Sequence, residues 1–481
     1  MKIKFTNLSF ETYLLPFLLL LINFILKIIY IGYGDIAGDE PFTIFYSQVD
    51  YETFSKMLQT ENNPPLFFVL IHFWIKIFGI SAISTRFLPL IFSTITVLFI
   101  YKTGMKFFNI RIAIISSLLF TFSNYHMYFA HETRVYSLFA LLTTISMYAF
   151  LSLILDKSKR GYFYLLIISN ILLIYSHFFG FFVLFIQFLS IISIKGLRDN
   201  LIKKYAFATF VTFILYVPYI KLLLDRFSSS SGGTWVSTPT FESLYNNLWK
   251  FSNAPVNTVF FILILLVALI AIIVKRKEIV NNHLVYSKVI LIWFLVPYFL
   301  MFFISFLIPI FLDRYLVFIS IAYYFTIAIS INYLSKPKWL FYSLSVLTVS
   351  LMLFTFNPKS SNDRKKNELA KTISDLKTEN TLVYLCPDWI DLGFVYYYNL
   401  DYFKDYKNTR IRLNGDNIFP INSASQINES FILNSESVIY LDGWSALVDS
   451  DNLIFEKLNK SFNKVDINES YEAYKIYHFT R

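Results

Sequence analysis

Long runs of apolar residues alternate with short polar segments along the first three quarters of the chain. A membrane-spanning helix needs about 20 mostly apolar residues. Runs that approach or reach this length lie approximately at Tyr13–Ile31, Ala82–Thr103, Ile112–Phe129, Val135–Leu155, Tyr162–Tyr175, Phe178–Ile194, Tyr205–Leu224, Thr258–Val274, Val289–Phe311, Tyr315–Tyr333 and Trp339–Phe356. The fifth run is short and weakly separated from the sixth. The pattern therefore predicts a polytopic α-helical membrane protein with about eleven transmembrane helices, counted to within one helix.

The stretch Leu66–Phe78 is apolar but too short to cross a bilayer. It is typical of a helix that lies at the membrane surface or enters the membrane part way. It follows the proline pair Pro64-Pro65, and proline suits the first turn of a helix.

After Phe356 the pattern changes to that of a small soluble α/β domain. Thr381–Cys386 and Ser437–Leu441 are short apolar runs bounded by polar residues, which predicts buried strands. Lys366–Leu376 and Asn452–Phe462 have helical spacing. The expected organisation is a transmembrane domain over 1–356, with an outer-face loop at 32–80, and an accessory α/β domain over 357–481.

The distribution of charge supports this division and predicts an orientation. Only 15% of residues are charged, against about 25% in soluble domains. Short loops with excess lysine and arginine face the cytoplasm, so the pattern favours a cytoplasmic N-terminus and an extracytoplasmic C-terminal domain. The net charge of +10 then marks the cytoplasmic flank, which argues against a nucleic-acid surface. The residues that carry this argument are Lys2, Lys4, Lys102, Lys106, Arg111, Lys157, Lys159, Arg160, Lys195, Arg198, Lys203, Lys204, Lys275, Arg276, Lys277, Lys336 and Lys338.

Two further features limit the interpretation. Cys386 is the one cysteine, so no disulfide can form within the chain. The first apolar run is long enough to span and lacks a small-residue cleavage site, so we interpret it as an anchor.

Carboxylates gather after the first predicted helix, at Asp35, Asp39 and Glu40. Acidic groups beside lipid headgroups are costly unless they meet a cation, a hydrogen-bond donor or a substrate. Asp39 and Glu40 either take part in chemistry or cap and solvate this segment.

The turn Ser123–Ser137 is rich in titratable residues, whereas a solvated loop favours Gly, Ser, Asn and Lys. Arg134 could hold a phosphate through its planar guanidinium. His131 and Glu132 could donate or accept protons or bind a ligand. The alternative is a helix turn in which Glu132 pairs with Arg134.

Two other predicted outer turns carry candidate residues. Asp313 and Arg314 interrupt a long apolar run, either as a functional pair or as a simple turn in which they pair with each other. His177 lies between the fifth and sixth predicted helices. It is either functional or a hydrogen-bonded structural histidine.

An ordered set of motifs covers about the first 330 residues. These motifs are Gly38-Asp39-Glu40, Asn63-Pro64-Pro65-Leu66, Phe78-Gly79, Thr85-Arg86-Phe87-Leu88-Pro89, Tyr101-Lys102-Thr103-Gly104, His131-Glu132-Thr133-Arg134-Val135-Tyr136-Ser137-Leu138, Ser176-His177-Phe178 and Arg314-Tyr315-Leu316. Together they resemble the membrane glycosyltransferases of the GT-C fold, of the dolichyl-phosphate-mannose protein mannosyltransferase type, in its broad bacterial branch. The last 120 residues or so carry no usable resemblance.

The resemblance implies an inverting glycosyltransferase that moves a sugar from a polyprenyl-phosphate carrier to a hydroxyl on a glycan, lipid or protein at the outer face of the membrane. Asp39 matches the family's general base, with Glu40 beside it as a second catalytic candidate. Arg134 and Arg314 are the cations available for the donor phosphate, with His177 as the next candidate. A bacterial plasma membrane is expected, since abundant Ile, Phe, Lys, Asn and Tyr suggest an AT-rich genome.

One position departs from the family pattern and bears on metal use. Family members often have an aspartate in the turn after the third helix, where this chain offers His131 and Glu132 as auxiliary acid–base groups or ligands. Fixed arginines make a metal unnecessary for a monophosphate leaving group. Some relatives nevertheless use a divalent cation, and Asp39, Glu40 and His131 could bind one.

Two other function classes stay open. A glycolipid transporter or flippase would usually show paired broken helices in corresponding halves, and the sequence contains no such repeat. A glycan polymerase or ligase would consume a polyprenyl-diphosphate sugar. In the C-terminal domain, Asp388, Trp389, Asp391 and Tyr396–Tyr398 either bind a sugar or form core and surface.

Overall fold

The computed structural model describes residues 10–61, 63–230, 236–274, 283–335, 337–359, 365–471 and 474–481. Two compact units emerge. The helical unit comprises Met1–Ile31, Leu58–Leu70 and Arg86–Ser360, and the α/β unit comprises Gly32–Met57, Ile71–Thr85 and Ser361–Arg481. Of the basic residues used to predict orientation, six lie outside the described residues: Lys2, Lys4, Lys275, Arg276, Lys277 and Lys336.

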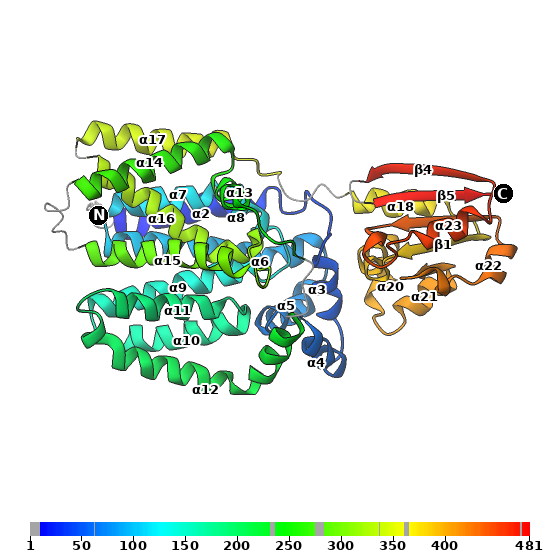
Figure 1. Cartoon of the computed structure of the whole chain (residues 1–481), viewed down its shortest axis with the longest axis horizontal. Helices are drawn as coiled ribbons and strands as arrows, with labels where there is room; N and C mark the ends of the chain where they lie inside the picture. Colours follow the sequence, from blue (N-terminus) through cyan, green and yellow to red (C-terminus); the bar gives the residue numbers. More distant parts are fainter. Residues whose placement is uncertain are drawn as a thin grey trace, which may run out of the picture. The chain divides into compact units, whose positions relative to one another are not determined.

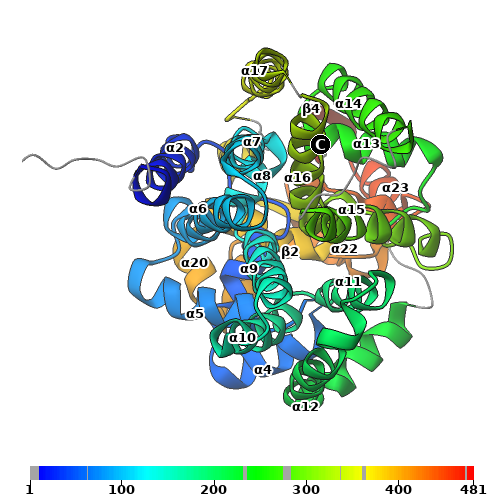
Figure 2. The same ribbon diagram turned by 90° about the vertical axis from the view of Figure 1, so that its left-hand side faces the viewer.

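The helical unit is a bundle of apolar helices, seen from the side in Figure 1 and end-on in Figure 2. Its elements are η1 Phe10–Leu14, α2 Leu15–Ile28, α6 Ala82–Phe107, α7 Ile110–Thr121, α8 Asn124–Ala130, α9 Tyr136–Leu155, α10 Arg160–Ser176, α11 Gly180–Ser193, α12 Arg198–Ser230, α13 Phe241–Ser252, α14 Pro255–Val274, α15 Leu284–Ile304, η2 Asp313–Leu316, α16 Val317–Leu334 and α17 Lys338–Phe354. Helix α5, Leu66–Phe78, begins in this unit and ends in the other. The first residues of α6 (82–85) belong to the other unit, and residues 58–60, at the end of α4 (Tyr51–Thr60), belong to this one.

Burial differs sharply among these helices. Helices α9 and α16 are buried on nearly all sides, and α9 contacts α10, α11 and α16 (Figure 2). In contrast, only 17% of the most apolar 18-residue stretch of α12 is buried, although its mean hydropathy is similar to that of α9 and α16. A helix with an apolar exposed surface suits contact with lipid, and a helix that is apolar all round suits the interior of a bundle.

The predicted polytopic helical fold is confirmed. Seven of the described helices are long and apolar enough to cross a membrane by length and composition, and the remaining predicted spans coincide with shorter apolar helices. The third predicted span is not one continuous helix, because the helix is interrupted between α7 and α8. At the interruption the Ser123 hydroxyl caps α8 by accepting a hydrogen bond from the His126 N–H at 3.3 Å. The ninth predicted span corresponds to α15, which ends at Ile304 instead of Phe311. Pro309 lies between these two positions, and proline lacks the N–H that would extend a helix.

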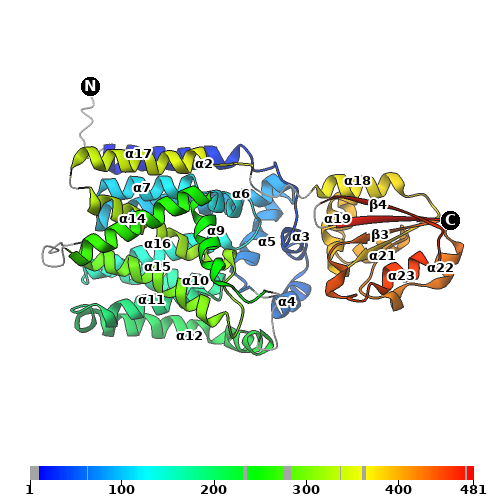
Figure 3. The same ribbon diagram turned by 45° about the horizontal axis from the view of Figure 1, so that its top comes forward.

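The α/β unit combines most of the predicted first loop with the C-terminal segment. Besides the end of α5, its elements are α3 Glu40–Tyr46, α4 Tyr51–Thr60, α18 Lys366–Leu376, β1 Thr381–Cys386, η3 Asp388–Ile390, α19 Asp391–Tyr398, α20 Leu400–Lys404, α21 Thr409–Gly415, β2 Ile418–Pro420, η4 Ala424–Gln426, α22 Glu429–Asn434, β3 Ser437–Asp442, η5 Ser445–Leu447, α23 Leu453–Asn459, β4 Lys464–Tyr471 and β5 Tyr474–Thr480. The strand order is β2-β1-β3-β5-β4. Strands β3 and β4 of this sheet are labelled in Figure 3. Strands β2, β1 and β3 are parallel, and β5 and β4 are antiparallel to their neighbours.

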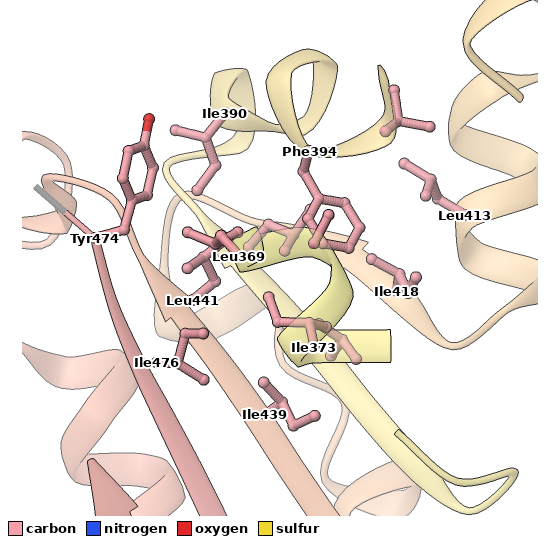
Figure 4. Close-up of a cluster of buried hydrophobic side chains, with 14 of the residues drawn as sticks. Leu369, Ile373, Ile390, Phe394, Leu413, Ile418, Ile439, Leu441, Tyr474 and Ile476 are labelled. Carbon is pink, nitrogen blue, oxygen red and sulfur yellow. The ribbon is translucent and has the colours of Figure 1, made fainter. Parts of the chain in front are cut away.

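Alternating residues of the sheet pack on two separate cores. Val383 and Leu385 of β1 face a core with α18 and α19, whereas Leu382 and Tyr384 face the core that contains α22 and α23. This alternation follows from the two-residue period of a strand. Figure 4 shows Leu369 and Ile373 of α18 against Ile439, Leu441 and Ile476 of the sheet.

The first of these cores includes residues of the first loop. Ile36, Ile44 and Phe45 pack among the buried side chains of the C-terminal segment. The grouping of contacts thus differs from the expected division at residue 356, which assigned the loop 32–80 to the transmembrane domain. A shared apolar core makes Gly32–Met57 part of the folded C-terminal unit, and Ile71–Thr85 belongs to the same unit, whereas Leu58–Leu70 belongs to the helical unit.

Candidate functional site

Asp39 and Glu40 lie at the start of α3 and have different surroundings. Gly38 turns the chain with a φ of +59°, a conformation that favours glycine. Glu40 is fully buried and accepts from the Ala37 N–H at 3.4 Å, so its carboxylate closes the turn from inside. Asp39 is half-buried and its side chain does not cap the helix. Of the two carboxylates, Asp39 is the one accessible to a substrate.

The segment that carries Asp39 is hydrogen-bonded to the C-terminal part of the α/β unit. The Ile36 N–H donates to the Tyr397 hydroxyl at 2.5 Å, and the Asn367 N–H donates to Asp35 Oδ2 at 2.8 Å. Further along, the Tyr396 hydroxyl donates to the carbonyl of Ile80 at 2.9 Å. These contacts fix the loop on both sides of α3.

The tyrosine run of the C-terminal domain is therefore used for packing and loop support. Tyr396 and Tyr397 bind the first loop, and Tyr398 donates to Asp416 Oδ2 at 3.1 Å. Of the two alternatives open for these residues, the structure shows their hydroxyls engaged within the protein.

Asp388 and Asp391 both pair with Arg410. Arg410 Nε lies 2.9 Å from Asp391 Oδ2, and its Nη2 lies 3.2 Å from Asp388 Oδ2. Burial raises the pKa of Asp391 to about 6, although Arg410 acts in the opposite direction. Asp391 is thus mainly a buried partner of Arg410, whereas half of the Trp389 side chain is exposed.

In the helical unit, three predicted phosphate-binding residues come together. Arg134 precedes α9, Arg314 lies in η2 and His177 ends α10 in the turn before α11. Burial lowers the pKa of His177, and the charges of Arg134 and Arg314 lower it further. The charges of both guanidinium groups thus act on one imidazole, although the three residues are far apart in sequence. The His177 ring also lies 5.8 Å from the ring of Tyr315, and the Arg314 guanidinium lies 5.9 Å from that same ring.

One ring N–H of His177 is left for a ligand to accept. Its ring stacks on Phe139 at 4.8 Å between centroids and on Phe179 at 5.1 Å. The Phe179 N–H donates to Nδ1 at 3.1 Å, which assigns the proton of the neutral ring to Nε2. Nε2 is buried and makes no hydrogen bond with the part of the chain that the structure describes. A buried donor of this kind is costly unless a ligand accepts from it.

Arg134 has a partner from outside its own turn. Arg134 Nη2 lies 3.6 Å from Glu61 Oε1, and both side chains are buried. Asn63 Nδ2 also donates to Glu61 at 2.8 Å. Sequence reasoning missed Glu61, although it lies two residues before the Asn63-Pro64-Pro65-Leu66 motif.

Asp313 is likewise engaged with a residue from another element. Its Oδ2 lies 2.6 Å from Lys250 Nζ of α13, and its Oδ1 accepts from the Arg314 backbone N–H at 2.7 Å. The Arg314 guanidinium lies over the Tyr315 ring at 5.9 Å. Asp313 therefore pairs with Lys250 of another helix, whereas the turn alternative had it pair with the Arg314 side chain.

His131 and Glu132 are both buried in the turn between α8 and α9. His131 Nε2 lies 2.5 Å from the carbonyl oxygen of Lys27, so this ring ties the turn to α2. Among the described residues, no three His, Cys, Asp or Glu side chains gather as a metal ion would require. His131 belongs to the helical unit, whereas Asp39 and Glu40 belong to the α/β unit.

A buried lysine was also missed. Lys27 is fully buried in α2, where its Nζ donates to Ser93 Oγ at 2.6 Å and lies 4.8 Å from the centre of the Phe120 ring. No local pattern pointed to this burial, because a lysine near the end of a predicted span is usually interpreted as a residue that reaches the interface.

Comparisons with known proteins agree with this architecture. Residues 62–220 match the model of the dolichyl-phosphate-mannose-protein mannosyltransferase family. The crystal structure of ArnT from Cupriavidus metallidurans in the apo state is similar, with a TM-score of 0.60 and 12% identity over 96% of this chain and 97% of ArnT. ArnT bound to undecaprenyl phosphate gives 0.59 and 11% over the same shares.

A third similar structure is the archaeal oligosaccharyltransferase AglB from Archaeoglobus fulgidus in complex with an inhibitory peptide and a dolichol-phosphate. Its TM-score is 0.60, with 10% identity over 98% of this chain and 75% of AglB. No curated protein sequence matches the chain. At such low identity the structural likeness establishes the fold, and together with the family match it confirms the resemblance inferred from the sequence motifs: this is a membrane protein of the GT-C fold.

Proposed function

We propose that this protein is an inverting glycosyltransferase that moves a sugar from a polyprenyl-phosphate carrier to a hydroxyl acceptor at the outer face of the membrane. The observation that carries the proposal is the convergence of Arg134, Arg314 and the buried Nε2–H of His177. The match to a mannosyltransferase family and the likeness to ArnT, which was crystallised with undecaprenyl phosphate, support the same donor class.

In the proposed reaction the donor phosphate is held by the three residues of the helical unit. A guanidinium offers two parallel N–H groups to phosphate oxygens, and His177 adds a third donor direction. As the bond between the anomeric carbon and the phosphate oxygen breaks, the polyprenyl phosphate leaves with an additional negative charge. Fixed cations and donors stabilise that charge without reorganisation. Glu61 pairs with the Arg134 guanidinium and offsets part of its charge.

Asp39 is proposed as the general base. It removes the proton of the acceptor hydroxyl while the acceptor oxygen attacks the anomeric carbon from the face opposite the phosphate, which inverts the configuration. Glu40 supports Asp39 by closing the turn that precedes α3, since its carboxylate already accepts from the Ala37 N–H.

We further propose that the reaction requires no divalent metal, because arginines and His177 supply the stabilisation that a metal would give to a monophosphate. Transfer should continue in excess chelator. An activity that is abolished by EDTA and restored by Mg²⁺ or Mn²⁺ would overturn this part of the proposal.

The proposed setting is a bacterial plasma membrane, with the N-terminus in the cytoplasm and the C-terminal domain outside. Reporter fusions after Lys159 should report the cytoplasm, and fusions after Glu61 and at the C-terminus should report the outside. A cytoplasmic C-terminus would contradict the orientation.

The donor class is tested directly with purified protein in lipid. Radiolabelled sugars on polyprenyl monophosphate and on polyprenyl diphosphate are offered with a panel of glycan, lipid and peptide acceptors. Transfer from the monophosphate alone supports the proposal. Transfer from the diphosphate alone would indicate a polymerase or ligase, and movement of the intact glycolipid across the bilayer without transfer would indicate a flippase.

A further inference from the structure

The parallel strands of the α/β unit create a topological switch point. Strand β1 connects to β2 on one side, and the chain then crosses to β3 on the other side of β1. In open α/β sheets, ligands bind at the carboxyl ends of the strands where the connections reverse direction. The switch point here lies between the carboxyl ends of β1 and β3, a position that the proposed reaction does not yet use.

Two half-exposed tryptophans lie at this position. Trp389 follows β1 and is 51% exposed, and Trp444 follows β3 and is 49% exposed. The segments that carry them touch, because the Gly443 N–H donates to the Cys386 carbonyl at 2.8 Å and a Cβ on Gly443 would lie 3.2 Å from Ile390 Cδ1. Figure 4 shows Ile390 near Tyr474, which is itself the ring neighbour of Trp444.

Trp444 has a backbone conformation that bulky residues avoid. Its φ is +69° and its ψ is 39°, in the left-handed region. Local hydrogen bonds hold it there, since the Ser445 N–H donates to Asp442 Oδ1 at 2.8 Å and the Leu447 N–H donates to the Trp444 carbonyl at 3.0 Å. Burial does not explain the choice of tryptophan, because half of the side chain is exposed. Strain of this kind at an exposed residue indicates a functional constraint.

The polar groups beside these rings suit a neutral, hydroxyl-rich ligand. Asp388 and Asp442 are only half-buried, and Arg410 bridges Asp388 to Asp391. Carboxylate and guanidinium groups hydrogen-bond with hydroxyls, and the negative face of an aromatic ring attracts the C–H groups of a sugar face. Lys366 Nζ also lies 3.0 Å from the centre of the Tyr474 ring, and Lys475 is paired with Asp442 in the sheet, so the three carboxylates near these rings meet three cations. Without an excess of positive charge, an anionic lipid surface is a poorer partner than a saccharide.

The carboxyl end of β1 is also connected to the segment that carries Asp39. Helix α19 follows Trp389 directly and packs on α3, where a Cβ on Gly393 would lie 3.7 Å from Pro41 Cγ. We propose that Trp389 and Trp444 form a binding site for a saccharide portion of the acceptor, at the carboxyl ends of β1 and β3. This assignment rests on the proposed function, in that it deepens the identity of the acceptor to a glycan or glycolipid.

The left-handed conformation of Trp444 allows a test that separates binding from folding. Trp444→Gly removes the ring and relieves the backbone strain, so the variant should unfold at the same temperature as the wild type or higher. Trp389→Ala is the second variant. Phe431→Ala is the matched control, because Phe431 is 47% exposed on α22, which precedes β3 and therefore lies toward the amino end of that strand.

The probe is a glycan microarray, with the labelled full-length protein in lipid nanodiscs. The wild type should bind at least one class of oligosaccharide, and each tryptophan variant should bind it about tenfold more weakly, the effect expected from losing one aromatic stacking partner. Phe431→Ala should bind like the wild type. Absence of glycan binding by the wild type, or equal binding by the tryptophan variants, would overturn the assignment.

Two parallel measurements separate a saccharide site from a membrane contact and from the transfer reaction itself. If the tryptophan variants lose association with phosphatidylglycerol vesicles while glycan binding is unchanged, the surface is a membrane contact and the assignment fails. Hydrolysis of a polyprenyl-phosphate sugar by water, without acceptor, tests the proposed function separately. Variants that keep this hydrolysis but lose glycan binding support the site. A wild type that binds glycans but cleaves no donor would contradict the proposed function and leave the saccharide site standing.

Discussion

The backbone N–H of Ile36 donates a hydrogen bond of 2.5 Å to the hydroxyl of Tyr397, although the two residues are 361 positions apart. Ile36 lies three residues before the proposed base, and Tyr397 lies on α19 of the C-terminal domain. The core shared by Ile44, Phe45 and the C-terminal segment reinforces this connection. The C-terminal domain thus supports the conformation of the segment that presents Asp39.

Tyr397→Phe should reduce the rate of transfer without weakening donor binding. The variant keeps the ring but leaves the Ile36 N–H without its acceptor, a loss of about 1–3 kcal/mol that allows other loop conformations. We expect kcat to fall roughly tenfold or more at an unchanged KM for the donor. Because the surroundings of Asp39 also loosen, the acid limb of the pH–rate profile should shift.

The matched control is Tyr398→Phe, which removes a neighbouring hydroxyl that bonds Asp416 instead of the loop. It should leave kcat and the pH profile unchanged. Equal effects of the two variants, or a change in thermal stability alone, would show that Tyr397 has only a structural role.

Stability should depend on pH through Asp391. Burial raises the pKa of its carboxyl to about 6 in the folded chain, against about 3.9 in an unfolded one. A raised pKa means that the protonated form is favoured by folding. The contribution of Asp391 to the free energy of unfolding is therefore complete below about pH 4 and is lost as the pH rises through about 6. The free energy of unfolding changes by roughly 3 kcal/mol across this window.

Thermal unfolding of the wild type and Asp391→Asn should be compared in detergent from pH 4 to pH 7.5. Asparagine does not titrate, so the melting temperature of the wild type should fall relative to the variant across this window. Asp401→Asn is the control, because Asp401 is exposed and its removal should leave the pH dependence unchanged. Parallel curves for the wild type and Asp391→Asn would contradict the assignment.

The sequence predicted well those elements whose signal is local. Strand β1 and helix α18 have the predicted bounds, because each is a short periodic run between polar residues. Strand β2 has three residues, and β4 is largely exposed and polar, so neither carries an apolar run that periodicity could detect. The break between α7 and α8 depends on a serine cap inside an apolar stretch, which hydropathy does not register.

In the candidate site, too, the sequence predicted the residues that lie in local motifs and missed those defined by packing. Motifs pointed to Asp39, Arg134, His177 and Arg314, but not to their partners. Glu61 is separated from Arg134 by 73 positions, and the pairing of Asp313 with Lys250 joins two elements 63 positions apart. Such pairings follow from packing and not from the local pattern. A single sequence therefore offers no direct route to them.

Asp39→Asn should abolish transfer while leaving donor binding largely intact. The substitution keeps the size of the side chain but removes the basic carboxylate, and general-base catalysis is usually worth about a hundredfold or more in rate. Glu40→Gln should differ, because Glu40 holds the turn through the Ala37 N–H and an amide oxygen can still accept that bond. It should lower stability and activity moderately. Near-normal turnover by Asp39→Asn with an inactive Glu40→Gln would move the base to Glu40.

Arg134→Lys and Arg314→Lys should each weaken binding of a non-hydrolysable polyprenyl-phosphate sugar. An ammonium cannot reproduce the two parallel N–H groups of a guanidinium, so a phosphate held by both loses affinity. Lysine can still satisfy the ion pair between position 134 and Glu61. A loss of donor binding with an unchanged melting temperature would therefore assign the guanidinium to the phosphate and not to the pair.

Asp313→Asn and Glu61→Gln complete this test. Asp313 pairs with Lys250, so Asp313→Asn should leave donor binding near normal. Glu61→Gln removes the buried carboxylate opposite Arg134, which should lower the melting temperature because a buried charge loses its partner. The same variant should bind the donor more tightly, since the phosphate then meets an Arg134 charge that the Glu61 carboxylate no longer offsets. If both lysine variants bind the donor like the wild type and Glu61→Gln binds it no better, these arginines are structural and the phosphate is held elsewhere.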